Sequence, residues 1–175
     1  MYLNSREGRE RQGPEVGTRA RQQRLETVSG EQRVLPVPGA ATMLTFMSTD
    51  CTLCKRIKPT LAQVAAEVEE VELVVLCAGA PDEVQEWAHG LDDVPVFPDP
   101  AHRVAARYRI GMTPFLVGVD ADGIVRARGL FNDEQGLVMA AREVLAAAEE
   151  EADQAVSLAA EPHRHVRLSQ EEAIR

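Results

Sequence analysis

The fifteen residues Thr45–Pro59, TFMSTDCTLCKRIKP, decide how this chain folds. They close a short apolar run, residues 41–48, and lead into two cysteines, Cys51 and Cys54, separated by two residues. Beyond the cysteines, apolar residues recur at helical spacing as far as Val68. The pattern predicts a buried strand followed directly by a helix that begins at Cys51.

Outward from this stretch, strand and helix patterns alternate along the chain. Further strands are expected at residues 71–77, 94–97, 115–120 and 124–130, and further helices at 81–89, 101–108 and from Asn132 or Asp133 to about Ala148. Parallel crossovers connect the first strands, and a Gly-containing turn joins the last two as a hairpin. We therefore expect an α/β fold with a mixed central sheet flanked by helices. Pro59 lies inside the first helix and is expected to kink it.

The ends of the chain differ in composition from its middle. The chain has 175 residues, which suits one domain with tails. Residues 1–33 carry seven basic and five acidic side chains and almost no large apolar ones, so we expect a disordered segment. Residues 34–150 form the expected domain. Residues 151–175 are expected to be an acidic, polar, flexible tail.

Charge and hydropathy exclude several classes of function. The formal net charge is -9 and the pI is near 5.0, which argues against nucleic-acid binding. No apolar run approaches the roughly 18 residues of a membrane-spanning helix. The amino terminus is polar and lacks the apolar centre of a secretion signal. The chain as written is expected to be a soluble protein without a membrane anchor.

The cysteine pair is the strongest candidate for chemistry. Cys51 is expected at the start of a helix, where free amides and the helix dipole stabilise an anion. A thiolate is the nucleophile in disulfide exchange, so Cys51 is expected to attack and Cys54, one turn further, to resolve the mixed disulfide. Lys55 and Lys58 favour a thiolate at this place and Asp50 opposes it, so the electrostatic balance stays open.

The cysteine pair has two alternatives to redox chemistry. A C-x-x-C can be half of a zinc site, but zinc usually takes four ligands. The other candidate ligands are Cys77, His89, His102, His163 and His165, and only the last two are spaced as a pair. The two cysteines could also be ordinary core residues. Neither alternative fits the place between a strand and a helix as well, so no metal or cofactor is expected. Cys77 ends an apolar run and is expected to be an inert buried thiol.

A second motif, Ile110-Gly-Met-Thr-Pro114, precedes the strand at residues 115–120. Proline is acceptable at the start of a strand, because its missing N–H costs least there. The bond between Thr113 and Pro114 is a candidate for a cis peptide. From the pattern alone, a cis bond and a simple turn are equally supported.

Together these motifs resemble the thioredoxin superfamily. The resemblance rests on the C-x-x-C-K-x-I-x-P run of residues 51–59, which follows the first apolar strand, and on the G-M-T-P turn of residues 111–114. It implies a thioredoxin-like fold in which Cys51 and Cys54 are the catalytic redox pair. It also implies a cis-proline at Pro114, with Thr113 and Pro114 presenting the backbone against which a substrate chain docks.

Within that superfamily, the chain resembles the TlpA-like branch and, inside it, the MauD family of methylamine dehydrogenase accessory proteins. The first likeness rests on residues 99–114 and on the hairpin of residues 119–129. The second rests on GPEVG at residues 13–17, on residues 48–55 and on RGLFN at residues 128–132. It implies a thiol–disulfide oxidoreductase, with a protein substrate and a redox partner, that forms or arranges disulfides in the methylamine dehydrogenase small subunit.

The chain departs from the thioredoxin pattern around the cysteines. Asp50 replaces the usual Trp, and Thr52-Leu53 replaces Gly-Pro. Thr45 stands where thioredoxins have a buried acid, so an internal proton acceptor for Cys54 is missing. Peroxiredoxins carry Thr three residues before the reactive cysteine, and that position is Ser48 here.

Two other functions and the location remain as alternatives. The chain could be a non-catalytic adaptor or chaperone with a thioredoxin fold, or a peroxidase. MauD-type proteins have an amino-terminal membrane helix that is not found in this sequence. The resemblance thus implies an extracytoplasmic, periplasmic-face protein if an anchor precedes Met1, and a cytoplasmic one otherwise. The oligomeric state stays open.

Overall fold

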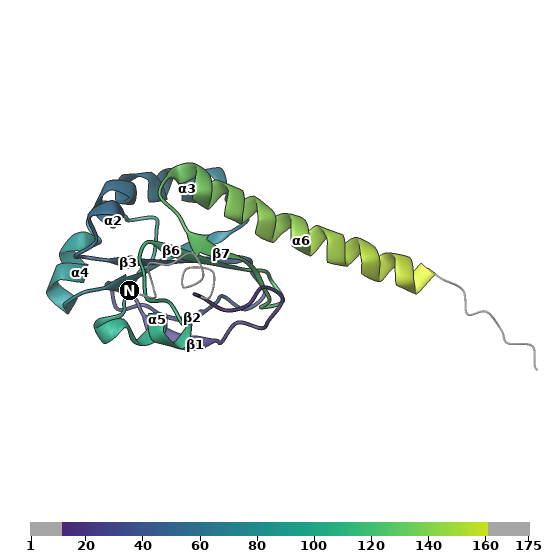
Figure 1. Ribbon diagram of the computed structural model, residues 1–175, viewed down its shortest axis with the longest axis horizontal. Coiled ribbons are helices and arrows are strands. Elements are labelled where there is room, and N and C mark those ends of the chain that lie inside the picture. The colour runs from purple at the N-terminus through teal and green to yellow at the C-terminus, as the bar shows by residue number, and fades with distance from the viewer. Residues whose placement is uncertain (1–11, 161–175) are drawn as a thin grey trace, which may run out of the picture.

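The structure is a computed structural model that describes residues 12–160, and expectations for residues 1–11 and 161–175, including His163 and His165, lie outside the described residues. A five-stranded mixed sheet forms its centre (Figure 1). The strands lie in the order β5-β4-β3-β6-β7 and comprise β3 (Thr42–Ser48), β4 (Glu72–Ala78), β5 (Val96–Pro98), β6 (Phe115–Val119) and β7 (Val125–Leu130). The predicted fold class is confirmed.

The central strand β3 is buried on both faces, as its apolar sequence predicts. It runs parallel to β4 and antiparallel to β6. The pairing with β6 places Phe46 opposite Phe115. The residues just before β6 therefore lie beside the residues just after β3.

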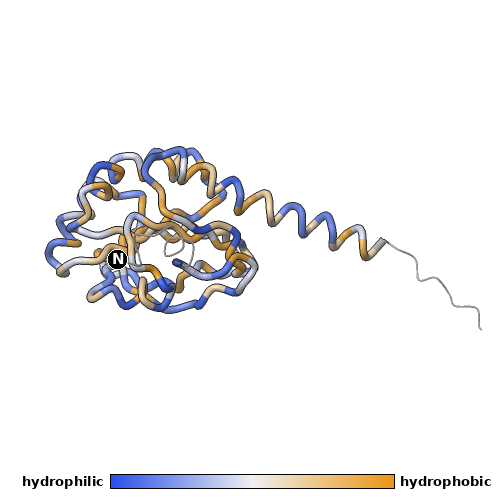
Figure 2. The backbone as a smooth tube through the Cα atoms, in the orientation of Figure 1, coloured by the Kyte–Doolittle hydropathy of each residue, from blue (hydrophilic) through white to orange (hydrophobic). Residues whose placement is uncertain are grey.

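Helices cover both faces of the sheet. Their bounds are α2 (Thr52–Ile57), α3 (Leu61–Glu67), α4 (Pro81–Trp87), α5 (Arg103–Arg107) and α6 (Glu134–Ala160), with short 3-10 turns η2 (Lys58–Thr60) and η3 (Pro100–His102). One apolar core packs α2, α3, α4 and α6 against one face, and a second packs α5 against the other. Figure 1 shows α2, α3 and α6 above the sheet and α5 below it, and Figure 2 shows the apolar strands between them.

Pro59 interrupts the first helix, as predicted. The α-helical hydrogen bonding gives way at Lys58 to η2, with the proline in its first turn, and resumes at Leu61 as α3. The break reflects the missing N–H of proline and the clash of its ring with the preceding turn. Leu61 and Val64 are then buried against the sheet, while Cys54 and Ile57 are buried from α2.

The expectation of a disordered segment over residues 1–33 is wrong for residues 12–33. These residues include β1 (Gln23–Glu26), which pairs antiparallel with β2 (Gln32–Leu35). The chain before β1 pairs with the last hairpin, since Gly17 N–H donates to the Val125 carbonyl at 2.8 Å and Ala20 N–H to the Gly123 carbonyl at 2.8 Å. The segment is ordered in spite of its low apolar content, because backbone hydrogen bonds hold it to the rest of the domain.

The last helix is longer than the sequence pattern indicated. We expected its end near Ala148 and a polar tail from residue 151, but α6 continues to Ala160. Alanine and glutamate are strong helix formers, and Arg126 Nη2 holds Glu151 Oε2 at 2.5 Å. The end of α6 projects from the domain (Figure 1), and residues 151–159 are exposed. Within residues 12–160, no helix combines the length and hydrophobicity needed to cross a membrane.

Candidate functional site

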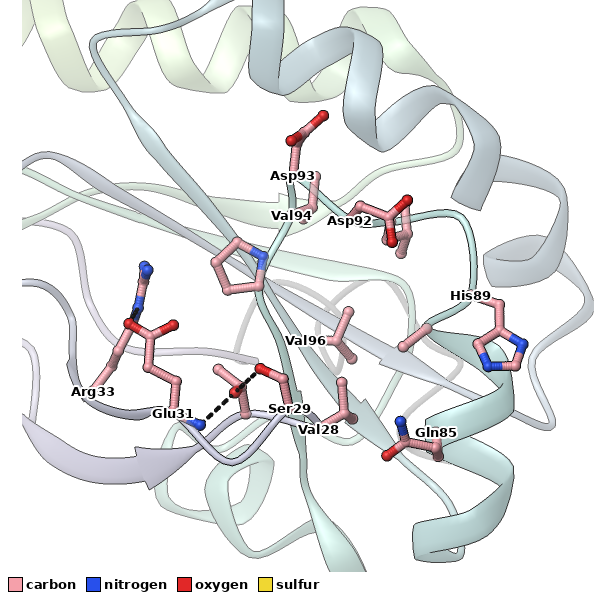
Figure 3. A pocket seen from close by; sticks show the side chains of 14 residues that line it. Val28, Ser29, Glu31, Arg33, Gln85, His89, Asp92, Asp93, Val94 and Val96 are labelled. Carbon is pink, nitrogen blue, oxygen red and sulfur yellow. Dashed lines mark hydrogen bonds and ion pairs between the residues drawn. The ribbon is translucent and has the colours of Figure 1, made fainter.

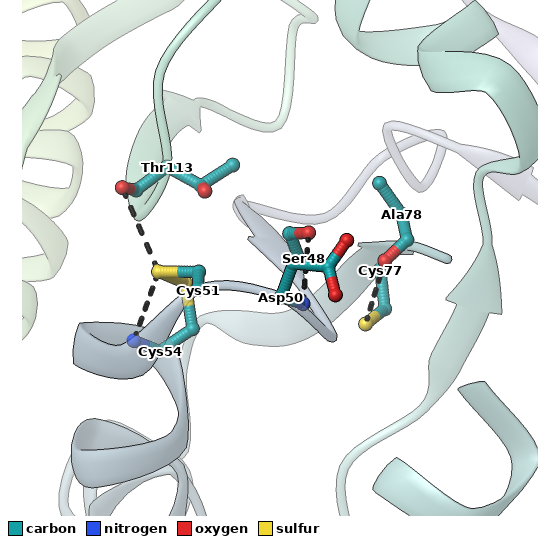
Figure 4. Close-up of a disulfide and its surroundings, with 7 residues drawn as sticks. All are labelled: Ser48, Asp50, Cys51, Cys54, Cys77, Ala78 and Thr113. Atoms are coloured by element: carbon teal, nitrogen blue, oxygen red, sulfur yellow. Dashed lines mark hydrogen bonds between the residues drawn. A yellow bond between two sulfur atoms is a disulfide. The ribbon is translucent and has the colours of Figure 1, made fainter. Parts of the chain in front are cut away.

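Cys51 and Cys54 lie at the junction between β3 and α2 and are joined by a disulfide (Figure 4). Cys51 is the N-cap of α2, with extended backbone angles, and Cys54 lies in the first turn of the helix. The Cα atoms of the two residues are 5.2 Å apart. The structure therefore brings together the two cysteines that the sequence singled out.

The two sulfur-bearing side chains differ in exposure. Cys54 is completely buried in the core under α2, whereas Cys51 is only half-buried. The backbone N–H of Cys54 donates to Cys51 Sγ at 3.1 Å. An amide aimed at a sulfur atom favours negative charge on that atom. A partner can reach Cys51 from solvent and cannot reach Cys54 without rearranging the helix.

The loop before β6 faces the disulfide. The peptide bond between Thr113 and Pro114 is cis. The Thr113 carbonyl oxygen lies 3.7 Å from Cys51 Sγ, as Figure 4 shows. Thr113 is half-buried and Pro114 is buried. All four residues predicted for the site therefore meet at one end of the central strands, because β3 and β6 are neighbours in the sheet.

An amino-terminal strap, residues 12–20, holds this loop from behind and was missed by the sequence analysis. Gln12 is 4% exposed, and its Oε1 accepts a hydrogen bond from the Gly111 N–H at 2.9 Å. Gly13 N–H donates to the Arg109 carbonyl at 3.0 Å, and Arg128 Nη1 donates to the Gln12 carbonyl. One polar side chain in a segment of low apolar content gave no sequence signal for this role.

Gly13 is the tightest point of the strap. Its φ is +81°, in the left-handed region, and a Cβ there would lie 2.9 Å from the Phe115 ring. Only glycine has both the conformational freedom and the small size that this position requires. The strap therefore packs directly against the first residue of β6.

Thr45 occupies the position of the acid expected from thioredoxins. It is fully buried in β3, and its hydroxyl donates to the Val74 carbonyl at 2.7 Å. The hydroxyl proton is thus engaged by the neighbouring strand. Thr45 serves the packing of the sheet and supplies no carboxylate for proton transfer to Cys54.

Cys77 is separate from the redox pair. It lies in β4 with no exposed surface, and its Sγ is 3.8 Å from the Ala78 carbonyl (Figure 4). Desolvation raises the pKa of the Cys77 thiol to about 12, with a small opposing effect from Lys58 and a small supporting one from Asp99. The predicted burial is confirmed, and the side chain remains a neutral thiol at ordinary pH.

A cavity of about 360 Å³ opens beside Cys51, between the start of α2 and α4. It is lined by Thr49, Asp50, Lys55, Glu83, Glu86 and Trp87. The Glu83 carboxylate is held in place by the Thr49 hydroxyl and the Ala80 N–H, both at 3.2 Å. Three carboxylates and one ammonium group therefore border the approach to Cys51 on this side.

A larger polar cavity of about 370 Å³ lies between the β1–β2 turn and the loop after α4 (Figure 3). Its wall includes the ion pair of Arg33 with Glu31 at 2.8 Å and the exposed carboxylates of Asp92 and Asp93. In residues 12–160, no three His, Cys, Asp or Glu side chains are grouped so that they could hold a metal ion.

Comparison with known proteins finds curated relatives among methylamine utilization proteins. The chain is 29% identical over 129 residues to the methylamine utilization protein MauD of Methylophilus methylotrophus, a match over 70% of this chain and 59% of MauD. It is 30% identical over 130 residues to MauD of Methylorubrum extorquens, over 71% and 62%. The match thus spans about three fifths of the length of these relatives.

Solved structures show the same fold. The dsbF structure of MTB, in mixed oxidised and reduced forms, superposes with a TM-score of 0.64 at 21% identity over 70% of this chain and 95% of dsbF. A secreted Mycobacterium tuberculosis disulfide oxidoreductase homologous to DsbE of E. coli superposes with a TM-score of 0.60 at 22% identity, over 69% and 95%. The resemblance to thioredoxin-like proteins of the TlpA type is confirmed.

A family model settles the classification. It matches residues 16–128, more than half of the chain, and this range contains both cysteines of the disulfide and the facing loop. The chain belongs to the AhpC/TSA family.

Proposed function

We propose that this protein is a thiol–disulfide oxidoreductase in which Cys51 exchanges disulfides with a protein partner and Cys54 resolves the intermediate. The observation that supports this most directly is the unequal exposure of the two linked sulfurs. A partner thiolate reaches Cys51, while Cys54 is fully buried. One accessible and one protected sulfur are what a two-step exchange requires.

In the oxidising direction, a partner thiolate attacks Cys51 Sγ in line with the disulfide. The new bond joins the partner to Cys51, and Cys54 leaves as a thiolate that takes up a proton. A second partner thiolate then attacks the partner sulfur in the mixed disulfide and displaces Cys51. The partner gains one disulfide and loses two electrons, and the protein is left with two thiols.

In the reduced protein, the Cys54 N–H and the Thr113 carbonyl both interact with the Cys51 sulfur. The amide stabilises the Cys51 thiolate as it leaves, because it already points at the sulfur at 3.1 Å. The carbonyl, 3.7 Å away, accepts the proton of the Cys51 thiol when the sulfur is neutral. Thr113 and Pro114 then present the backbone against which an extended partner segment docks.

The relatives support a substrate class. Proteins named for methylamine utilization match this chain over about 70% of its length. By that resemblance, the substrate is the methylamine dehydrogenase small subunit, in which the protein forms or arranges disulfides. An extracytoplasmic location fits such a role, since disulfides persist in oxidising compartments, and a solved structure with this fold is described as secreted.

Trapping of a mixed disulfide tests the proposed exchange. Reduced Cys54→Ser protein lacks the resolving thiol, so it should accumulate a covalent complex with a disulfide-bonded probe such as insulin. Cys51→Ser is the matched control, because it keeps one cysteine of the pair in its buried place. We expect a complex that reductant dissolves with Cys54→Ser and none with Cys51→Ser.

The same pair of variants separates the alternatives. If Cys51→Ser supports substrate maturation as well as the wild type, the protein is an adaptor and the proposal fails. If reduced Cys54→Ser reacts rapidly with hydrogen peroxide and forms no complex with insulin, Cys51 is the reactive cysteine of a peroxidase instead.

A further inference from the structure

Four arginines surround a cavity on the side of the molecule where the strap meets α5. The cavity has a volume of about 530 Å³. Arg19 lines it from the strap, and Arg21 directly follows the strap. Arg107 lines it from the end of α5, and Arg109 from the loop beyond. All four side chains are exposed to solvent. The other described residues of the lining are neutral and include Tyr108.

The positive charges of this arginine cavity, as we name it, are not neutralised within residues 12–160. Arg19 Nη1 donates to the Asp122 backbone carbonyl at 2.6 Å, and Arg107 Nη1 donates to Gln23 Oε1 at 2.7 Å. Both acceptors are uncharged. Neither Arg21 nor Arg109 makes a side-chain hydrogen bond or an ion pair to any described residue.

Three other arginines of the described residues are paired with carboxylates. The protein has 28 acidic residues and a net charge of -9, so carboxylates are plentiful. Arg33 pairs with Glu31, Arg126 with Asp120, and Arg142 with Glu67. Four cations placed around one cavity without a carboxylate from residues 12–160 repel one another, and a bound anion would remove that repulsion.

The walls of the cavity are tied to each other by backbone contacts. The Tyr108 hydroxyl donates to the Arg21 carbonyl at 3.0 Å. Gly13 N–H donates to the Arg109 carbonyl at 3.0 Å. These bonds hold the strap against α5 and fix the spacing between the two pairs of arginines. The cavity is therefore preorganised, although its charged side chains are free to turn toward a ligand.

The chemistry of the lining defines the class of ligand. Guanidinium groups bind phosphate and carboxylate in bidentate geometry, and within residues 12–160 no acceptor engages the side-chain donors of Arg21 and Arg109. A volume of about 530 Å³ lies in the range of small-molecule sites. We propose that the arginine cavity binds a small multivalent oxyanion that bridges the strap and α5. This site is independent of the redox reaction proposed above.

Calorimetric titration with pyrophosphate, at matched ionic strength, tests the site. The test variant is Arg21→Gln/Arg109→Gln, which removes two guanidinium groups that make no hydrogen bond or ion pair with described residues. The control is Arg24→Gln/Arg103→Gln, which removes the same charge from exposed arginines outside the cavity lining. We expect saturable one-to-one binding to the wild type, at least tenfold weaker binding to the test variant, and a change below twofold in the control.

Citrate and anionic vesicles complete the experiment. Citrate should compete with pyrophosphate, because both carry several oxyanion groups. Absence of saturable pyrophosphate binding to the wild type overturns the proposal, and so does equal weakening in the two double variants. Binding to phosphatidylglycerol vesicles that pyrophosphate does not displace overturns it in favour of a membrane surface. If the double variant fails to fold, the single variants Arg21→Gln and Arg109→Gly replace it, the second because Arg109 has a φ of +58° that glycine adopts freely.

Discussion

The Thr113 carbonyl oxygen faces Cys51 Sγ across 3.7 Å, although the two residues are 62 positions apart in the chain. The antiparallel pairing of β3 with β6 creates this proximity, and the strap fixes the loop from the other side through Gln12. The Cys51–Cys54 disulfide and the loop that faces it therefore depend on three separate segments of the chain.

Alkylation of the reduced protein should distinguish the three cysteines. Cys51 is half-buried, whereas Cys54 and Cys77 have no exposed surface. Burial also keeps Cys77 protonated, with a pKa raised to about 12. We expect iodoacetamide at neutral pH to modify Cys51 first and Cys77 only after unfolding, as measured by peptide mass mapping. Modification of Cys77 in the folded protein at the rate of Cys51 would contradict the structure.

Stability should fall at alkaline pH because of the same buried thiol. Cys77 ionises near pH 9.0 in the unfolded chain and near 12 in the folded one. Between these values the folded state holds the extra proton, so rising pH favours unfolding by up to about 1.4 kcal/mol per pH unit. Burial raises the pKa of Tyr108 as well, which adds to the loss.

Replacing the thiol isolates its share of this loss. Cys77→Val fills a similar buried volume and does not titrate, so its urea-unfolding free energy should decline less steeply between pH 9 and 11 than that of the wild type. Tyr108 is unchanged in the variant and remains as an internal reference. Identical slopes for the two proteins would show that Cys77 ionises equally in both states.

The two strap glycines offer a matched comparison. Gly13 and Gly17 both have left-handed φ values, +81° and +86°, but only Gly13 would bring a Cβ close to another residue, 2.9 Å from the Phe115 ring. Gly17→Ala should therefore lose only about 1 kcal/mol from backbone strain. Gly13→Ala should lose clearly more in chemical denaturation. Equal losses would mean that the strap does not pack against β6.

Gln12 should protect the amide of Gly111. In Gln12→Ala the Gly111 N–H loses its acceptor, which should cost about 1 kcal/mol and speed hydrogen exchange at that amide. Gln22→Ala is the control, because Gln22 is an exposed glutamine shortly after the strap. Unchanged hydrogen exchange at the Gly111 amide in Gln12→Ala would show that the strap does not hold the loop through Gln12.

Thr45 should matter for stability and not for electron transfer. Thr45→Val keeps the shape of the side chain and removes the hydrogen bond to the Val74 carbonyl, so about 1 kcal/mol of unfolding free energy should be lost. The rate of disulfide exchange with insulin should stay within twofold of the wild-type rate. A large fall in that rate would give the hydroxyl a part in proton transfer.

The sequence predicted the two cysteines and the facing proline better than the contacts that hold them in place. Cys51, Cys54 and Pro114 belong to local motifs at the ends of strands, and such motifs carry their chemistry in a few neighbouring residues. The role of Gln12 depends on a bond to Gly111, 99 positions away, which no local pattern reveals. The last helix was expected to end near Ala148, but α6 continues to Ala160 because the alanines beyond that point favour helix.

Cys51 and Cys54 should form a reversible two-electron couple. A redox titration of the full chain in glutathione buffers tests this, with the oxidation state scored by mass after alkylation. We expect one transition in which the Cys51–Cys54 disulfide forms and Cys77 stays reduced. A midpoint potential of about -270 mV would identify a reductant, and one of roughly -120 to -180 mV would identify an oxidant or isomerase. If no intramolecular disulfide forms across the range, the proposed exchange reaction is wrong.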